Sequence, residues 1–268
     1  SSNDHPVSIL FYQNIISFIF LGIFYFFNFK KFKITSQIFN FFFLISISGV
    51  VIPGTLFYIA ASKVPAGILS LSVAFVPMLT YVSSLYLKIE TFSLLRILGV
   101  FLGFIAIFLL IGPPDSFADR SMVPWVLIAM ICPICYTFEN VFIDVKKPIE
   151  VNSITLALGS SAITILILLP IIFYFELFID IKYPFQKIEF SIIALGLITA
   201  VAYTLFIYLI TNAGAVFASN VGYVVTISGV IWGIVLFQET HSYWVWLSLI
   251  TMIVGLSLVS PRRKNKKT

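Results

Sequence analysis

The sequence predicts an all-α protein that crosses a membrane many times. Of its 268 residues, 60% are hydrophobic and only 10% are charged, whereas soluble domains carry about 25% charged residues. The apolar residues form long continuous runs rather than the alternating pattern of transmembrane barrel strands. A helix needs about 20 apolar residues to cross a hydrocarbon core of roughly 30 Å.

Nine runs of about this length follow one another along the chain, and each is predicted to be a membrane span. They cover residues 7–29, 38–61, 64–87, 94–111, 122–143, 153–175, 190–211, 213–237 and 243–260. The connection at Lys63 is so short that the second and third spans must be antiparallel neighbours. Pro53 and Pro77 lie inside these two spans and are expected to kink them.

The basic residues are divided unevenly between the two faces of the membrane if the nine spans alternate. The larger group holds twelve residues: Lys30, Lys31, Lys33, Lys88, Arg96, Lys146, Lys147, Arg262, Arg263, Lys264, Lys266 and Lys267. The smaller group holds four: Lys63, Arg120, Lys182 and Lys187. This asymmetry predicts a cytoplasmic C-terminus, with the basic tail 262–268 as an anchor, and an external N-terminus. The expected location is the cell membrane, specifically a bacterial inner membrane. The net charge of +5 is therefore expected to interact with the lipid bilayer and not with nucleic acid.

An internal duplication relates the two parts of the chain at a constant offset of 149 residues (239 − 90), which aligns Glu239-Thr240 with Glu90-Thr91. Five spans separate the two acids. Because five is odd, the copies are predicted to have opposite orientations, as in inverted-repeat secondary transporters. The first repeat, 1–114, holds four spans and the second, 122–261, holds five. Span 122–143 therefore lacks a partner, which we expect to precede Ser1.

Both repeated acids lie in turns, where we interpret them as charges at a helix N-terminus with local hydrogen bonds. Glu139 is different because it lies well inside a span, where burying a carboxylate costs about 2.5–3.5 kcal/mol on insertion scales. It shares an interior-facing helical stripe with Cys132, Cys135 and Tyr136. Two interpretations stay open: Glu139 contacts a substrate amine or a proton, or it reaches toward lysines at the cytoplasmic end of the span.

Polar and aromatic side chains in several spans are candidates for contact with an amphipathic organic solute. The candidate substrate-binding residues are Gln13, Asn14, Tyr58, Tyr81, Glu139, Asn140, Tyr203, Asn220 and Tyr223. The same pattern is also typical of hydrogen bonds between helices. A titrating Glu139 would in addition allow proton coupling.

Other chemistry has little support in the sequence. There is no P-loop for an ATP-driven motor, and the only histidines, His5 and His241, do not suggest a metal site. Cys132 and Cys135 lie in an apolar span without the context of a redox motif and are interpreted as packing residues. No cofactor, metal or enzyme activity is therefore expected. Two alternatives to transport stay open, a membrane-embedded lipid-modifying enzyme and a non-transporting membrane subunit.

Small residues repeat at a spacing of four in two spans, at Gly99-x3-Gly103 and Thr251-x3-Gly255. Such faces allow helices to approach closely. The sequence does not distinguish packing inside one chain from the seam of a homodimer.

The two repeats resemble the EamA repeats of the drug/metabolite transporter superfamily. The resemblance covers essentially the whole chain and rests on residues 61–67 with the helix to Glu90, and on residues 211–239 with 218–223. In both repeats small residues follow the acid at nine and sixteen positions, Gly99 and Ala106, then Ser248 and Gly255. The resemblance implies ten helices in two inverted halves, cytoplasmic termini, and transport of small metabolites such as amino acids, often outward. This chain departs from the family in two ways. It has nine spans, and Gln13 stands at the arginine position of the Phe-Tyr-Arg-Asn sequence that is common in the family.

Overall fold

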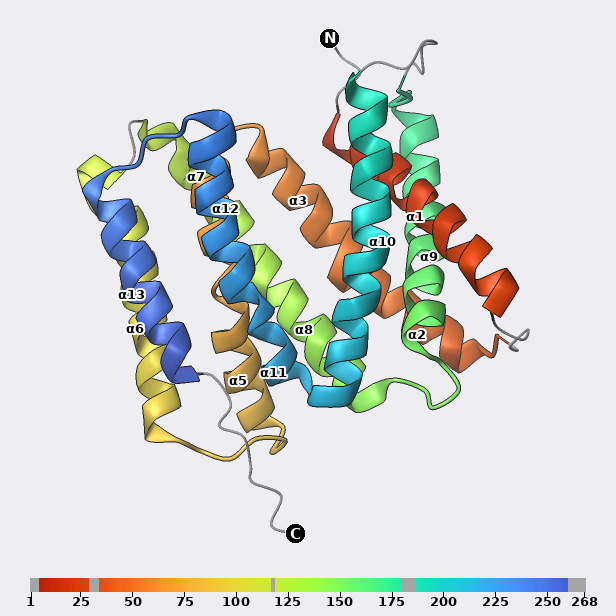
Figure 1. Cartoon of the computed structure of the whole chain (residues 1–268), viewed down its shortest axis with the longest axis horizontal. Helices are drawn as coiled ribbons and strands as arrows, with labels where there is room; N and C mark the ends of the chain where they lie inside the picture. Colours follow the sequence, from red (N-terminus) through yellow and green to blue (C-terminus); the bar gives the residue numbers. More distant parts are fainter. Residues whose placement is uncertain (1–4, 29–33, 117–118, 180–186, 260–268) are drawn as a thin grey trace. The chain divides into compact units, whose positions relative to one another are not determined.

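Every regular element is a helix in the residues that the computed structural model describes, 5–28, 34–116, 119–179 and 187–259 (Figure 1). Eight stretches are long and apolar enough to cross a membrane: Pro6–Phe27, Ser36–Ala61, Ala66–Tyr86, Leu94–Ile111, Arg120–Lys146, Ser153–Tyr174, Glu189–Ala213 and Ala215–Phe237. These findings confirm the predicted all-α polytopic fold. The ninth predicted span is α13 (Tyr243–Val259), an apolar helix of 17 residues that is about 25 Å long. The basic tail 262–268 lies outside the described residues.

The helices form two compact units, and each unit takes helices from both predicted repeats. The first unit comprises Ser1–Ile59 and Phe142–Asn212, and the second comprises Ala60–Val141 and Ala213–Thr268. The duplication itself and the inverted orientation of its copies stay predictions.

In the first unit, α1 (Pro6–Asn28) and α2 (Ser36–Ser46) both pack on α9 (Ser153–Tyr174). The core of the α1–α9 contact contains Leu10, Phe11 and Ile172. The ring of Phe42 fits against α9 at Gly159, where a Cβ atom would lie 2.4 Å from the ring. This glycine therefore allows α2 to approach α9 closely. The long helix α10 (Lys187–Ala213) completes the unit.

The predicted kink at Pro53 takes the form of a π-helical segment. After α2 the chain forms η1 (Ile47–Val51) and continues as α3 (Ile52–Ala61), with Pro53 in its first turn. Proline has no N–H to donate and its ring clashes with the preceding turn, so a wider turn relieves both problems. Close to this point the side chain of Leu10 packs against Gly54. A Cβ atom added to Gly54 would lie 2.8 Å from the Leu10 side chain.

Three helices of the second unit are interrupted inside the predicted spans. The first, α4 (Ala66–Val73), gives way to α5 (Val76–Tyr86), which begins with Pro77 in its first turn. Short 3-10 helices at Pro114–Ser116 and Arg120–Met122 lead to α7 (Val123–Ala129), which breaks before α8 (Ile131–Lys146). The third, α11 (Ala215–Ser219), breaks at Asn220 before α12 (Val221–Phe237). Discontinuous helices of this kind commonly line substrate and ion sites in transporters.

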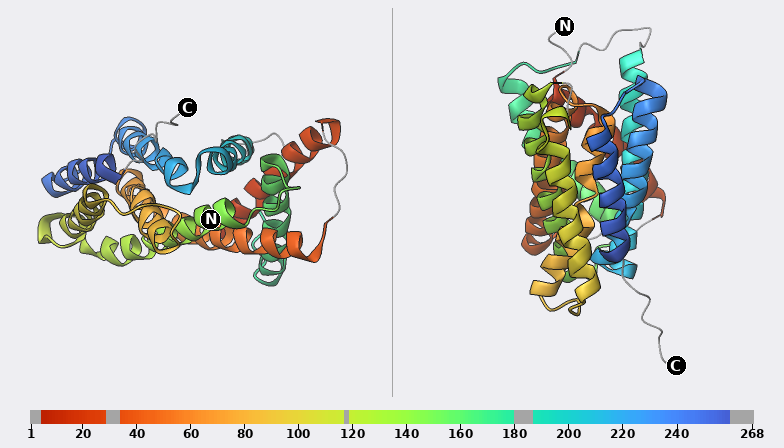
Figure 2. Two further views of the ribbon diagram at one scale, coloured as in Figure 1. Left: turned by 90° about the horizontal axis from the view of Figure 1, so that it is seen from below. Right: turned by 90° about the vertical axis from the view of Figure 1, so that its left-hand side faces the viewer.

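The closest helix pair of the second unit is α6 (Leu94–Ile111) with α13. They run side by side in Figure 1 and in the right-hand view of Figure 2. A Cβ atom on Gly99 would lie 2.4 Å from the Gly255 carbonyl oxygen, and one on Gly255 would lie 2.7 Å from that of Gly99. Ser248 also donates a hydrogen bond to the Ala106 carbonyl at 2.7 Å. The small-residue faces are therefore used for packing within the chain.

Candidate functional site

A polar cluster in the first unit links α1, α3 and α10. The Tyr58 hydroxyl donates to Gln13 Oε1, and Gln13 Nε2 donates to Thr199 Oγ1 at 2.8 Å. The structure thus brings two of the candidate residues together and adds Thr199 to them. Thr199 is an isolated threonine in an apolar span, so the sequence gave no reason to select it. Next to this cluster, Asn14 is 3% exposed and donates to the Leu10 carbonyl of its own helix at 2.8 Å. Tyr203, half-buried, follows Thr199 by one turn of α10.

A second polar cluster lies between α5 and α8 in the second unit. Thr137 Oγ1 is 3.5 Å from Thr80 Oγ1 and 3.5 Å from the Val76 carbonyl oxygen. One turn farther along these helices come Ser84 and Asn140. Glu139 and Asn140 are 2% and 0% exposed. Of the predicted interior stripe of α8, Cys132 and Glu139 are buried, and Cys135 and Tyr136 are half-buried. Cys132 and Cys135 on that stripe are not joined in a disulfide bond.

Asn140 is notable because neither polar atom of its side chain has a hydrogen-bond partner among the described residues, and the same is true of the Ser84 hydroxyl. Leaving a buried polar group unpaired costs about 1–3 kcal/mol. An amide offers both a donor and an acceptor, and so does a hydroxyl. This cluster can therefore bind a water molecule or a polar solute group that also both donates and accepts.

The remaining candidates of the second unit have different surroundings. Tyr81 is fully buried. Its hydroxyl donates to the Thr91 carbonyl and accepts from the Ser93 N–H. The Arg96 guanidinium lies 5.1 Å from the centre of its ring. Its ring and hydroxyl thus hold the turn before α6, and its predicted contact with substrate stays a prediction. Asn220 and Tyr223 are half-buried at the break between α11 and α12.

Polar groups of α4 and α12 pair with each other. The Ser70 hydroxyl donates to the Thr226 carbonyl at 3.1 Å, and the Thr226 hydroxyl donates to the Ser70 carbonyl at 3.1 Å. A Cβ atom on Gly229 would lie 2.3 Å from the Ser70 side chain, so the two helices are in close contact here. At this place the polar pattern of the spans serves hydrogen bonding between helices, which was one of the two interpretations of the sequence.

Glu239 is a charge at a helix N-terminus, as predicted, but the helix is far away in the sequence. Its carboxylate accepts hydrogen bonds from the backbone N–H groups of Ala66 at 2.6 Å and Gly67 at 3.0 Å, at the start of α4. The His241 ring lies 3.4 Å from the same carboxylate. Burial lowers the pKa of His241, and the nearby Glu239 carboxylate opposes this shift. Gly67 and Gly233 make room for the cap, because a Cβ atom on either would lie within 3.0 Å of the carboxylate or the ring.

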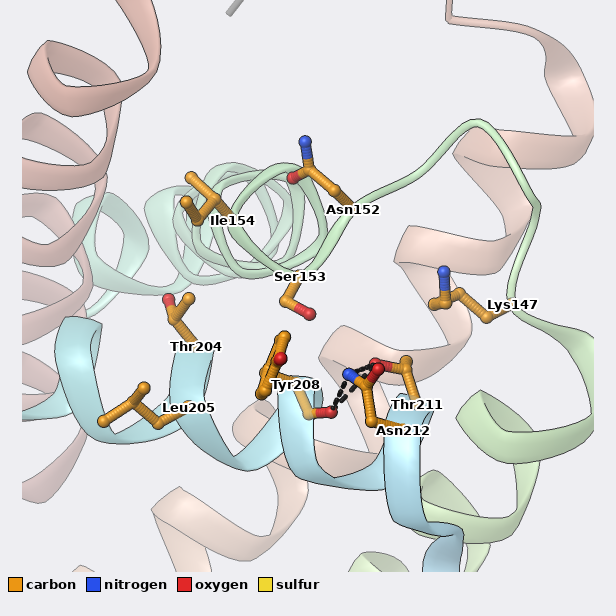
Figure 3. Close-up of a pocket in the computed structure, with 9 residues that line it drawn as sticks. All are labelled: Lys147, Asn152, Ser153, Ile154, Thr204, Leu205, Tyr208, Thr211 and Asn212. Carbon is orange, nitrogen blue, oxygen red and sulfur yellow. Dashed lines mark hydrogen bonds between the residues drawn. The ribbon is translucent and has the colours of Figure 1, made fainter. Parts of the chain in front are cut away.

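An open pocket of about 440 Å³ lies in the first unit, where α8 and α10 end and α9 begins. It is lined by Lys147, Asn152, Ser153, Ile154, Thr204, Leu205, Tyr208, Thr211 and Asn212 (Figure 3). None of these residues was a site candidate in the sequence, where Lys147 was a topology signal and one of the lysines that Glu139 could reach. The described parts of the chain contain no group of three or more His, Cys, Asp or Glu side chains that could hold a metal ion.

Comparison with known proteins identifies the family. The chain is similar in fold to a solved structure titled "Crystal structure of protein", with a TM-score of 0.71, 14% sequence identity, and coverage of 97% of this chain and 90% of that one. A search of curated proteins finds no match. The model of the EamA-like transporter family matches residues 1–112 and 123–260, which is almost the whole chain. The buried polar clusters thus lie within the helices of a multi-pass membrane protein that belongs to the EamA-like transporter family.

Proposed function

We propose that this protein is a secondary transporter that exports small organic metabolites such as amino acids. The observation that carries the proposal is the buried polar cluster of α5 and α8, in which Glu139 is 2% exposed and Asn140 has no partner among the described residues. A carboxylate and an unpaired amide inside a span are costly, so they favour a functional role in binding a polar solute. The carboxylate favours a solute with a cationic group, and its titration would couple transport to protons.

The proposed substrate contacts are Gln13, Asn14, Tyr58, Tyr203, Glu139, Asn140, Asn220 and Tyr223. In alternating access, the two inverted repeats rock so that this solute site opens to each side of the membrane in turn. The broken helices support such a site, because backbone groups at the ends of discontinuous helices commonly bind substrate or ions in transporters.

A flux screen on the full-length protein tests the proposed function. Proteoliposomes loaded with a mixture of amino acids and other small metabolites should lose one class of solute faster than protein-free liposomes. The released solutes are measured by mass spectrometry, with and without an imposed proton gradient. Equal release from liposomes with and without protein, across the whole mixture and with either gradient, would contradict the transporter assignment.

The proposed orientation places the C-terminus in the cytoplasm, and cysteine labelling tests it. In a background without Cys132 and Cys135, Lys182→Cys should react with a membrane-impermeant maleimide in intact cells, because the excess of basic residues predicts that this loop is external. Lys264→Cys should react only after the cells are permeabilised. External labelling of Lys264→Cys would show that the orientation is reversed. Both positions lie outside the described residues.

A further inference from the structure

The pocket that contains Lys147 lies in the first unit, where the last residues of α8 and of α10 meet the start of α9. The α8 helix ends at Lys146, α9 begins at Ser153 and α10 ends at Ala213. Because these helices are long enough to span the membrane, their ends are expected at the level of the lipid headgroups. The pocket therefore lies at the boundary between the hydrocarbon core and water.

One end of the pocket is suited to an anion. Within the described residues the Lys147 ammonium donates one hydrogen bond, to the Val151 carbonyl at 2.8 Å, and two of its three donors have no partner there. It makes no ion pair among the described residues. Burial lowers the pKa of Lys147, because a partly desolvated ammonium is less stable in its charged form. A bound anion would compensate this charge.

The start of α9 adds backbone donors next to Lys147. Leu156 N–H gives its hydrogen bond to the Asn152 carbonyl, and the Asn152 side chain accepts from Thr155 N–H at 2.8 Å. The N–H groups of Ser153 and Ile154 precede these bonds and have no partner within the helix. The N-terminus of a helix attracts phosphate through such N–H groups and through the helix dipole.

The opposite end of the pocket is apolar. Figure 3 shows Lys147 at one end and Ile154, Thr204 and Leu205 at the other. The Thr204 hydroxyl donates to the Ala200 carbonyl of its own helix at 2.7 Å, so this end presents mainly apolar groups. Leu205 is 61% exposed, and Tyr208, which lies between the two ends, is 59% exposed. A cationic end and an apolar end in one open pocket match the two parts of a phospholipid.

We propose that this pocket binds an anionic phospholipid of the surrounding bilayer, with its phosphate against Lys147 and the start of α9 and an acyl chain along Ile154 and Leu205. This site lies outside the proposed substrate contacts and does not depend on what the protein transports. A free phosphate would satisfy the cationic end but would leave the apolar end unfilled, so the geometry favours the lipid as the source of the phosphate.

Lipid binding to the delipidated full-length protein in nonionic detergent tests the proposal. Native mass spectrometry measures the bound fraction during titration with phosphatidylglycerol or phosphatidylcholine. We expect phosphatidylglycerol to bind more tightly. Lys147→Gln should weaken its binding about fivefold or more, because a lysine near a lipid phosphate contributes roughly 1 kcal/mol. Lys146→Gln is the matched control, since it removes the same charge one residue away from the pocket, and it should change binding by less than about twofold.

Two further measurements separate the parts of the proposal. Leu205→Asn should weaken phosphatidylglycerol binding through the acyl chain and should not disturb folding, because Leu205 is mostly exposed. Inorganic phosphate and glycerophosphoglycerol, which lack acyl chains, should fail to displace the lipid. Equal losses in Lys147→Gln and Lys146→Gln, or equal binding of the two lipids, would overturn the anion site. Displacement by the chain-free compounds together with normal binding to Leu205→Asn would overturn the lipid as the source.

Discussion

The Glu139→Gln variant is expected to abolish transport or to uncouple it from protons, while its folding remains normal. Glutamine has nearly the same shape as glutamate but has no negative charge and does not titrate near neutral pH. If Glu139 contacts a cationic group or a proton in the buried cluster, the loss of that charge removes the attraction that favours the solute there. The measurement is solute flux in proteoliposomes with the wild-type substrate, with protein quantity and thermal stability checked for each variant.

Glu150→Gln is the matched control, because Glu150 is an exposed carboxylate of the loop that follows α8. It should transport like the wild type.

Tyr223→Ala should weaken substrate binding by about 1–3 kcal/mol if its ring stacks on the solute and its hydroxyl is paired. Normal flux in both Glu139→Gln and Tyr223→Ala would show that the substrate binds elsewhere and that these residues serve packing between helices.

Gly99→Ala is expected to destabilise the protein by about 1–3 kcal/mol or more, because the added methyl group would overpack the α6–α13 contact. The nearest obstacle is the backbone oxygen of Gly255 at 2.4 Å, and a backbone atom does not move aside as a flexible side chain does. The helices must therefore separate to admit the methyl group. Thermal unfolding of the purified protein in detergent measures the loss.

Gly22→Ala is the control for this second prediction, since it makes the same substitution in a span with open space. A Cβ atom on Gly22 would meet only Leu158 Cδ1, at 3.9 Å. Alanine also has a higher helix propensity than glycine, so this variant should be as stable as the wild type or slightly more stable. If the two variants unfold at the same temperature, close packing at Gly99 contributes nothing to stability.

The positions of the spans were predictable because membrane insertion depends on the summed transfer free energy of consecutive residues. The runs 94–111 and 153–175 therefore match α6 and α9 within a residue. The breaks near Pro53 and Pro77 were predictable for a similar reason, since the missing N–H of a proline removes a hydrogen bond from its own helix. The EamA-type pattern of small and acidic residues also indicated the family before the fold was known.

The partners of the polar residues depended on the tertiary structure. Glu139 and Tyr81 both looked like candidates for substrate contact, yet the hydroxyl of Tyr81 is bound by the turn at Ser93, while Glu139 lies in a cluster with unpaired groups. Glu239 caps a helix that begins 173 residues earlier in the sequence, and no local pattern reveals such a contact. Likewise, Lys147 gains a pocket only because the ends of α8 and α10 meet the start of α9.

The fold class, the family and the approximate limits of the spans follow from the amino-acid sequence alone. These properties depend on local hydrophobicity, charge and backbone chemistry, which each segment carries with it. The packing of the helices, in contrast, sets which polar groups are paired and which are left unpaired. Pairing depends on distances of about 3 Å between atoms of different helices, and those distances exist only after the helices have packed.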